Sequence, residues 1–324
     1  MSRRNGGLLE SYYQNCVLCP RACKIGRINE ASGFCGQSAE VRLACATLHR
    51  GEEPPLVTGA GSGALFFSGC TLGCRDCQNR QISHEGTGAE ISKEDMADLM
   101  LRLENEGAAN INFVTATHFT PSVIGALKTA RSRGLSIPAV WNTSGFETPA
   151  TLELLDPWID IYLTDIKTLS PVSARRETGR GDYPDIVRAA LPPMLRNRPV
   201  LYKNDSLIRG VIVRHLVLPE YVEESLDVIR WYGRKVGKKG MFSLMTQYLN
   251  PREPDHQRGI SGFEFDLLSD ALAEAGIDEG FVQEPAGMKD PSRKDWLPDF
   301  TRSNPFPEQY SRVMWHYRQG FVSR

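Results

Sequence analysis

Residues 64–79, ALFFSGCTLGCRDCQN, place three cysteines directly after a short apolar run. The run, residues 64–67, has the length and composition of a buried strand. Cys70, Cys74 and Cys77 follow it with the spacing Cys-x3-Cys-x2-Cys. A [4Fe–4S] cluster normally takes four cysteines, so three thiolates would hold three irons and leave the fourth open for another ligand. Zinc is the alternative, but tetrahedral zinc needs a fourth ligand, and the spacing to His84 does not supply one.

The composition excludes several classes of protein. The chain has 324 residues, 41% of them hydrophobic, which is enough for a large core. Its 38 Lys and Arg against 39 Asp and Glu give a net charge of −1, which argues against nucleic acid or an anionic membrane surface as an obligatory partner. No apolar stretch predicts a signal peptide or a membrane span, so we expect a soluble, cytoplasmic protein.

The eight cysteines all lie in the first 77 residues, and this spacing in a cytoplasmic chain indicates metal or redox chemistry more than disulfides. Outside the loop already quoted, four of them fall within twenty residues: Cys16, Cys19, Cys23 and Cys35. They are expected to hold either a second [4Fe–4S] cluster or a structural zinc ion, and the spacing fits both. Cys45 is left over, either as a small core residue or as a thiol that returns a hydrogen atom to a substrate radical.

Strands and helices are predicted to alternate from residue 64 to residue 275. Ser92 and Asp95 are typical of a helix start, and the apolar residues that follow them recur at helical spacing. Residues 210–218, GVIVRHLVL, form the clearest strand. The pattern contains six strand–helix pairs, which predicts a parallel sheet with right-handed crossovers. Six units are fewer than the eight of a closed barrel, so we expect an open partial (βα)6 barrel, with a doubly wound sheet as the alternative.

This pattern divides the chain into three parts. Residues 1–60 are expected to be an irregular, cysteine-rich, metal-binding extension. Residues 61–284 form the partial barrel, and the aromatic segment 285–324 is expected to pack on it.

The cysteine loop after the first strand of six βα units resembles that of the radical S-adenosylmethionine (radical SAM) superfamily. In that family the open iron binds S-adenosylmethionine (SAM), and an electron from the cluster cleaves it to a 5′-deoxyadenosyl radical that abstracts hydrogen from a C–H bond. Residues 141–146 (WNTSGF), 163–167 (LTDIK) and 214–219 (RHLVLP) are similar to strand ends of pyruvate formate-lyase activating enzyme-like proteins. The whole chain resembles their PflX-type branch.

This resemblance implies roles for polar residues at the strand ends. Asn142, Thr143 and Asp165 are placed around SAM and a bound monovalent cation. Lys167 and His215 are placed near the SAM carboxylate, where cationic or donor groups are expected at the carboxyl edge of a barrel.

The family's second-strand Gly-Gly-Glu, which holds the SAM amine, is replaced here by residues 115–118, TATH. We therefore expect Thr115 and Thr117 to supply those hydrogen bonds, and His118 to do so or to face the substrate. Gln247 and Tyr248, which follow the sixth predicted strand, are further candidates for substrate contacts.

Three functions are compatible with these residues. The first is activation of a glycyl radical enzyme, in which hydrogen is taken from a backbone glycine of a protein or peptide. The second is radical modification or epimerisation of a small molecule or carbohydrate, with Cys45 as hydrogen donor. The third is a non-enzymatic zinc or electron-transfer protein, which the polar strand ends disfavour. Both enzymatic hypotheses imply an electron donor such as flavodoxin or ferredoxin.

Overall fold

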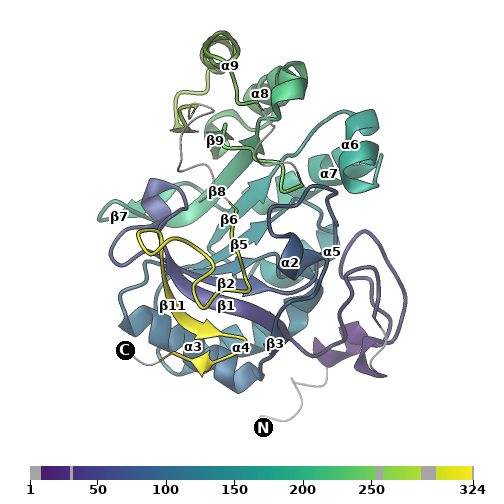
Figure 1. Ribbon diagram of the computed structural model, residues 1–324, viewed down its shortest axis with the longest axis vertical. Helices are drawn as coiled ribbons and strands as arrows, with labels where there is room; N and C mark the ends of the chain where they lie inside the picture. Colours follow the sequence, from purple (N-terminus) through teal and green to yellow (C-terminus); the bar gives the residue numbers. More distant parts are fainter. Residues whose placement is uncertain (1–8, 30–31, 253–257, 286–296, 323–324) are drawn as a thin grey trace.

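The fold is built on one twisted sheet (Figure 1). The computed structural model describes residues 9–29, 32–252, 258–285 and 297–322. Its strands are β1 (Arg42–His49), β2 (Ser62–Phe67), β3 (Ala89–Glu90), β4 (Ile111–Val114), β5 (Ala139–Thr143), β6 (Ile161–Asp165), β7 (Leu201–Lys203), β8 (Ser206–Leu216), β9 (Met241–Met245), β10 (Gly280–Val282), β11 (Ser311–His316) and β12 (Gly320–Phe321). The order across the sheet is β10-β9-β8-β6-β5-β4-β2-β1-β11-β12, with β3 paired to β1 and β7 to β8.

The helices are α2 (Arg80–Ser83), α3 (Lys93–Asn105), α4 (Thr120–Ser132), α5 (Pro149–Leu155), α6 (Pro171–Thr178), α7 (Tyr183–Leu195), α8 (Val222–Lys235) and α9 (Gly262–Glu274). The larger ones, α3 to α9, lie along the outer face of this sheet (Figure 1), whereas Ile82 of the short α2 packs with Phe66 and Phe300 on the inner face. Short 3-10 helices are η1 (Ser11–Tyr13), η2 (Arg27–Asn29), η3 (Pro54–Leu56), η4 (Thr117–Phe119), η5 (Pro219–Tyr221) and η6 (Gly237–Lys239). The larger helices share one apolar core with the sheet, which is the source of most of their stability.

The predicted partial barrel is confirmed. Strands β2, β4, β5, β6, β8 and β9 are parallel neighbours, and each is followed by helix that packs on the outer face. The cap of α3 is the predicted one, since the Ser92 side chain accepts a hydrogen bond from the backbone N–H of Asp95 at 3.0 Å. The described end strands β10 and β12 do not pair with each other, so the sheet stays open.

The prediction that residues 1–60 are irregular is wrong for Arg42–His49. These residues form β1, which pairs antiparallel with both β2 and β11. Six of its eight residues are buried, on both faces. A strand covered on both sides shows no polar–apolar alternation, and RLACATLH has no long apolar run either, so the usual strand signals are missing.

The inner face of the sheet is covered by two segments from outside the βα units. Leu56 of η3 packs among strand side chains at the centre of the barrel. Phe300 and Phe306 pack on Phe66, with ring centroids 5.7 and 5.1 Å away. The C-terminal segment, yellow in Figure 1, therefore covers the inner face and extends the sheet through β11 and β12, while residues 286–296 at its start lie outside the described residues.

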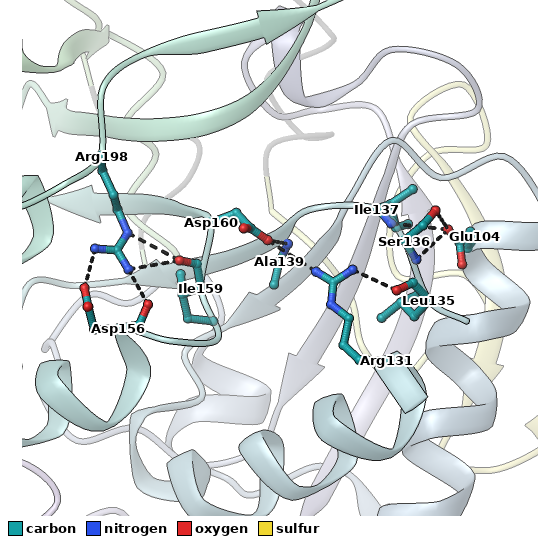
Figure 2. Close-up of polar contacts among 10 residues, drawn as sticks. All are labelled: Glu104, Arg131, Leu135, Ser136, Ile137, Ala139, Asp156, Ile159, Asp160 and Arg198. Atoms are coloured by element: carbon teal, nitrogen blue, oxygen red, sulfur yellow. Dashed lines mark hydrogen bonds and ion pairs between the residues drawn. The ribbon is translucent and has the colours of Figure 1, made fainter. Parts of the chain in front are cut away.

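The amino ends of β5 and β6 are fixed by a row of polar contacts (Figure 2). The buried Arg198 donates to the Asp156 carboxylate at 2.6 Å and to the Ile159 carbonyl at 3.0 Å. Farther along the row, Arg131 donates to Asp160 at 3.3 Å. This edge is occupied by structural pairs, which leaves the opposite, carboxyl edge for a site. In the described part of the chain, no helix is long and apolar enough to cross a membrane.

Candidate active site

The cysteine loop connects β2 to α2 and turns tightly at two glycines. Gly69 has φ +81° and Gly73 has φ +70°, a backbone region that favours glycine. A Cβ on Gly69 would lie 2.5 Å from the Cys35 carbonyl oxygen, and one on Gly73 would lie 2.9 Å from the ring of Phe34. Both glycines therefore let the N-terminal segment lie directly against the loop.

The loop opens into a cavity of about 420 Å³ at the carboxyl ends of the parallel strands. That volume is within the range of small-molecule and cofactor sites, about 300–1,000 Å³. The thiols of Cys70, Cys74 and Cys77 line one wall, and all three cysteines are free. Polar residues at the ends of β4, β5, β6 and β8 line other parts of it, together with apolar side chains such as Phe66 and Met245.

The sulfur of Cys70 is surrounded by donors. The backbone N–H groups of Leu72 and Gly73 donate to it, and the Lys167 ammonium lies close enough to stabilise its charged form. Burial nevertheless raises the pKa of the Cys70 and Cys74 thiols, because a thiolate loses its hydration there. These thiols therefore favour a state in which a bound cation compensates their charge.

Asp165 and Lys167, both at the end of β6, form an ion pair inside the cavity. The Lys167 Nζ lies 2.7 Å from Asp165 Oδ2. Burial disfavours the charged amine, but Asp165 and Cys74 outweigh it and hold the pKa of Lys167 above its usual range. The backbone is fixed by Tyr183, whose hydroxyl accepts from the Lys167 N–H and donates to the Ser144 carbonyl. Lys167 is thus a permanent cation at a fixed place beside the thiols.

His215 lies at the cavity wall, but both of its ring nitrogens are already engaged. Nδ1 lies 2.7 Å from the carbonyl of Ile166 and Nε2 lies 2.9 Å from the hydroxyl of Ser225 on α8. Burial lowers the pKa of His215 to about 4, so the ring is neutral at pH 7. The geometry makes His215 a support for the end of β6, next to Lys167, and not an additional cation.

The ends of β4 and β5 place Thr115, Asn142 and Thr143 at the cavity. Thr115 has φ +60°, which is a genuine outlier for a β-branched residue. Thr143 donates at 2.7 Å to Glu147, which also accepts from Thr117 at 2.7 Å and from Trp141 at 3.1 Å. Glu147 is fully buried, and burial raises its pKa despite these donors. No local pattern points to a buried Glu147, because an acidic residue after a strand is ordinarily a surface residue.

The floor of the cavity contains a buried ion-pair cluster that the sequence also did not reveal. Arg214 of β8 pairs with both Glu52 and Glu53. Glu52 also accepts from the Asn112 amide at 2.9 Å. Residues 52–55 therefore enter the barrel, although Glu-Glu-Pro-Pro has the composition of an exposed break between elements.

Comparison with known proteins identifies this arrangement. Residues 65–232 match the model of the radical SAM superfamily. The chain belongs to the radical SAM superfamily. It is accordingly an enzyme of this class, and membership implies a [4Fe–4S] cluster and SAM as its cofactors.

Individual relatives of this radical SAM protein are distant. An uncharacterized protein of Methanocaldococcus jannaschii is 28% identical over 282 residues, covering 84% of this chain and 78% of that protein. Streptococcus suis SuiB bound to the precursor peptide SuiA is 12% identical over 68% of this chain and 47% of SuiB, with a TM-score of 0.45. A domain of pyruvate-formate lyase-activating enzyme from Bacteroides vulgatus is 10% identical over 51% of this chain and 91% of that domain, with a TM-score of 0.37. This chain thus spans about half the length of SuiB.

The radical SAM loop fits the cluster that the family implies. Its three cysteines line one cavity, backbone N–H groups donate to the sulfur of Cys70, and the Lys167 ammonium lies near Cys70 and Cys74. Among the described residues, no three His, Cys, Asp or Glu side chains are arranged to hold a single metal ion.

Several predicted site residues lie outside the described cavity lining. Thr117 points to Glu147, and His118 is buried against Phe119 with Nε2 2.8 Å from the Ser68 carbonyl. Burial lowers the pKa of His118 to about 3. Both turn away because η4 begins at Thr117, two residues after Thr115, and carries them beneath the loop. Neither the SAM contact expected of Thr117 nor the SAM or substrate contact expected of His118 fits this geometry.

Of the remaining predicted site residues, some lie at the cavity and others do not. Tyr248 lines the cavity, but its neighbour Gln247 is not part of the described lining. Cys45 of β1 is fully buried in an apolar cluster with Phe66 and Phe300. A hydrogen donor must reach the substrate, so this position corrects the suggestion that Cys45 acts as one and makes it a core residue.

The four N-terminal cysteines lie on one segment outside the sheet. Backbone hydrogen bonds shape its first turn, in which the Lys24 N–H donates to the Cys16 carbonyl and the Ala22 N–H to the Cys19 carbonyl, both at 2.9 Å. Their segment lies beside α5 (Figure 1), where Thr151 donates to the Leu18 carbonyl at 2.7 Å. The structure therefore places this group next to the radical SAM loop.

Proposed function

We propose that Cys70, Cys74 and Cys77 hold the [4Fe–4S] cluster and that SAM occupies the adjoining cavity. The observation that carries this proposal is the convergence of three free thiols and the polar ends of β4, β5 and β6 on one space. When bound and reduced, the cluster supplies the electron that cleaves SAM to methionine and a 5′-deoxyadenosyl radical, which abstracts a hydrogen atom from a substrate C–H.

The residues of the chain bind and orient SAM in this proposal. Lys167 donates to the SAM carboxylate, and His215 keeps the end of β6 in place. Thr115 and Asn142 offer polar groups to the amine and ribose. Asp165 supplies a carboxylate for a monovalent cation beside the cosubstrate. An electron donor of the flavodoxin or ferredoxin class supplies the electron.

A segment of protein or peptide is the substrate that the surface supports best. The cavity continues into a second space of about 470 Å³, and Asp76, Arg176, Leu218 and Tyr248 belong to both. Charged residues of both signs line this outer space. A polar outer space that opens into the cavity of the reacting centre suits an extended chain, whose backbone needs donors and acceptors along its length. A glycine in such a segment, as in a glycyl radical enzyme, is the target we propose.

Cleavage of SAM tests the chemistry. Anaerobically reconstituted protein with dithionite should convert SAM to 5′-deoxyadenosine, and Cys70→Ala should abolish the reaction. Cys45→Ala is the matched control, because it also removes a thiol but from the apolar cluster, and it should retain cleavage. A wild type that yields no 5′-deoxyadenosine would refute the proposal.

Isotope transfer tests the substrate class. Extract of cells grown in deuterated medium is separated by ultrafiltration, and each fraction is incubated with the reduced enzyme and SAM. Deuterium in 5′-deoxyadenosine from the macromolecular fraction supports a protein substrate. Transfer from the small-molecule fraction alone would instead support modification of a small molecule or carbohydrate.

We also propose that Cys16, Cys19, Cys23 and Cys35 bind a metal centre. The support is Arg27, which is fully buried and has no ion-pair partner among the described carboxylates. Its Nη1 lies 3.7 Å from Cys16 Sγ. A buried cation requires an anion, and four thiolates around a metal supply one.

Metal analysis of Cys16→Ala distinguishes the two kinds of centre. Loss of about four irons relative to wild type indicates a second [4Fe–4S] cluster, and loss of one zinc indicates a structural zinc site. Unchanged metal content would contradict the proposal.

A further inference from the structure

Arg21 connects the N-terminal cysteine segment to the radical SAM loop. Its Nε donates to the Thr71 carbonyl at 3.1 Å, and its Nη2 donates to the Leu72 carbonyl at 2.8 Å. The guanidinium stacks on Phe34, 3.4 Å from the ring centroid. Because Phe34 itself lies against Gly73, the arginine and the aromatic ring hold the loop from the same side.

The two carbonyls that Arg21 binds belong to two particular peptide groups. The Thr71 carbonyl is in the same peptide group as the Leu72 N–H, and the Leu72 carbonyl is in the same group as the Gly73 N–H. These two N–H groups are the ones that donate to the sulfur of Cys70. A hydrogen bond at the oxygen end of a peptide group polarises it and strengthens the donor at its other end. Arg21 therefore acts on the cluster ligand through both groups at once.

The charge of Arg21 acts in the same direction. Its guanidinium interacts electrostatically with the thiols of both Cys19 and Cys70. The reduced cluster carries one more negative charge than the oxidised cluster, so a nearby cation and stronger N–H···S bonds both favour reduction.

We propose that Arg21 is a positioning residue that raises the reduction potential of the cluster at Cys70, Cys74 and Cys77. Through it, the N-terminal segment helps to set the potential at which SAM is cleaved. This inference rests on the cluster assignment made above, and it assigns to the extension an influence on the catalytic centre in addition to its own metal site.

The test is a redox titration of reconstituted enzyme, followed by the electron paramagnetic resonance signal of the reduced cluster. The signal that changes when SAM is added identifies the catalytic cluster. Arg21→Gln should lower its midpoint potential by about 59 mV, which for one electron is a tenfold change in the reduction equilibrium. Arg21→Lys keeps the charge but can reach only one carbonyl with a single nitrogen, so a smaller shift in the same direction is expected. Lys24→Gln, which removes a positive charge from the same segment, should leave the potential unchanged.

The outcomes separate the two proposals. A wild type without any SAM-sensitive signal would refute the cluster assignment itself. An intact SAM-sensitive signal that titrates at the wild-type potential in Arg21→Gln would overturn the role of Arg21. If Arg21→Gln does not retain the cluster, the midpoint potential of Arg21→Lys is the test. A wild-type potential in Arg21→Lys overturns the proposal, and a lowered potential supports it.

Discussion

Replacing Lys167 by methionine tests the cosubstrate site most directly. Methionine keeps most of the length and apolar stem of lysine but removes the ammonium, which lies 2.7 Å from Asp165 and close to the thiol of Cys74. A hydrogen bond between charged groups contributes about 1.5–3 kcal/mol. At 1.4 kcal/mol for each factor of ten, the loss predicts about 10- to 150-fold weaker SAM binding.

The unpaired Asp165 increases this effect. Without Lys167 its carboxylate faces the carboxylate of SAM, so the loss should lie toward the upper end of the range. The double variant Asp165→Asn with Lys167→Met removes that repulsion and should bind SAM more tightly than Lys167→Met alone. Lys128→Met, on the exposed side of α4, is the matched control.

The assay is equilibrium binding of SAM to reconstituted enzyme, together with iron content. Iron content should be the same in the wild type and in the three variants, because Lys167 is not a cluster ligand. Wild-type affinity in Lys167→Met with full iron content would refute the assignment of this residue to the SAM carboxylate.

Three further changes test the supports of the site. Burial raises the pKa of Glu147, so its protonated form is favoured by folding. Wild-type stability should therefore fall relative to Glu147→Gln as the pH rises above about 4.3, the pKa of glutamate in an unfolded chain. Parallel pH profiles of thermal unfolding for the two proteins would contradict this. Arg198→Met should lower the free energy of unfolding by about 1.5–3 kcal/mol in denaturant titrations, because its hydrogen bonds to Asp156 and Ile159 are lost. SAM affinity should be unchanged, because Arg198 lies at the opposite edge of the sheet. Thr115→Gly removes about 1–2 kcal/mol of backbone strain, and it also removes the hydroxyl. The variant should therefore bind SAM more weakly but be no less stable than wild type. A lower melting temperature would contradict the strain at Thr115.

The parts of the fold that could be predicted are those in which local pattern and tertiary environment agree. The predicted strand 64–67 lies within β2, and the loop of Cys70, Cys74 and Cys77 follows it as its spacing indicated. Strand β1 could not be predicted because it is covered on both faces. Its sequence therefore shows neither the two-residue period of a half-buried strand nor the 3.6-residue period of an amphipathic helix. Local signals describe a segment, whereas β1 is defined by its neighbours β2 and β11.

The polar residues of the interior were unpredictable for a related reason. Glu52, Glu53 and Glu147 look like surface residues in the sequence. The cation that pairs with Glu53 is Arg214, more than 150 residues later in the chain. Glu147 accepts from the nearby Thr143, but also from Thr117, which lies 30 residues before it. A buried acid is tolerated only when such partners are assembled, so its place becomes visible only in the fold.

The segment 115–118 shows how one backbone angle decides which residues can bind SAM. Thr115 adopts φ +60°, and its N–H donates to the Asn142 carbonyl at 2.9 Å. The chain therefore leaves the sheet edge at Thr115, and η4 takes the next polar side chains beneath the loop, where His118 contacts the Ser68 carbonyl. Thr115 is then the only hydroxyl of this segment in the described cavity lining. If SAM occupies the cavity as proposed, we therefore expect its amine to be held on this side by Thr115 and groups from β5, and not by Thr117 or His118.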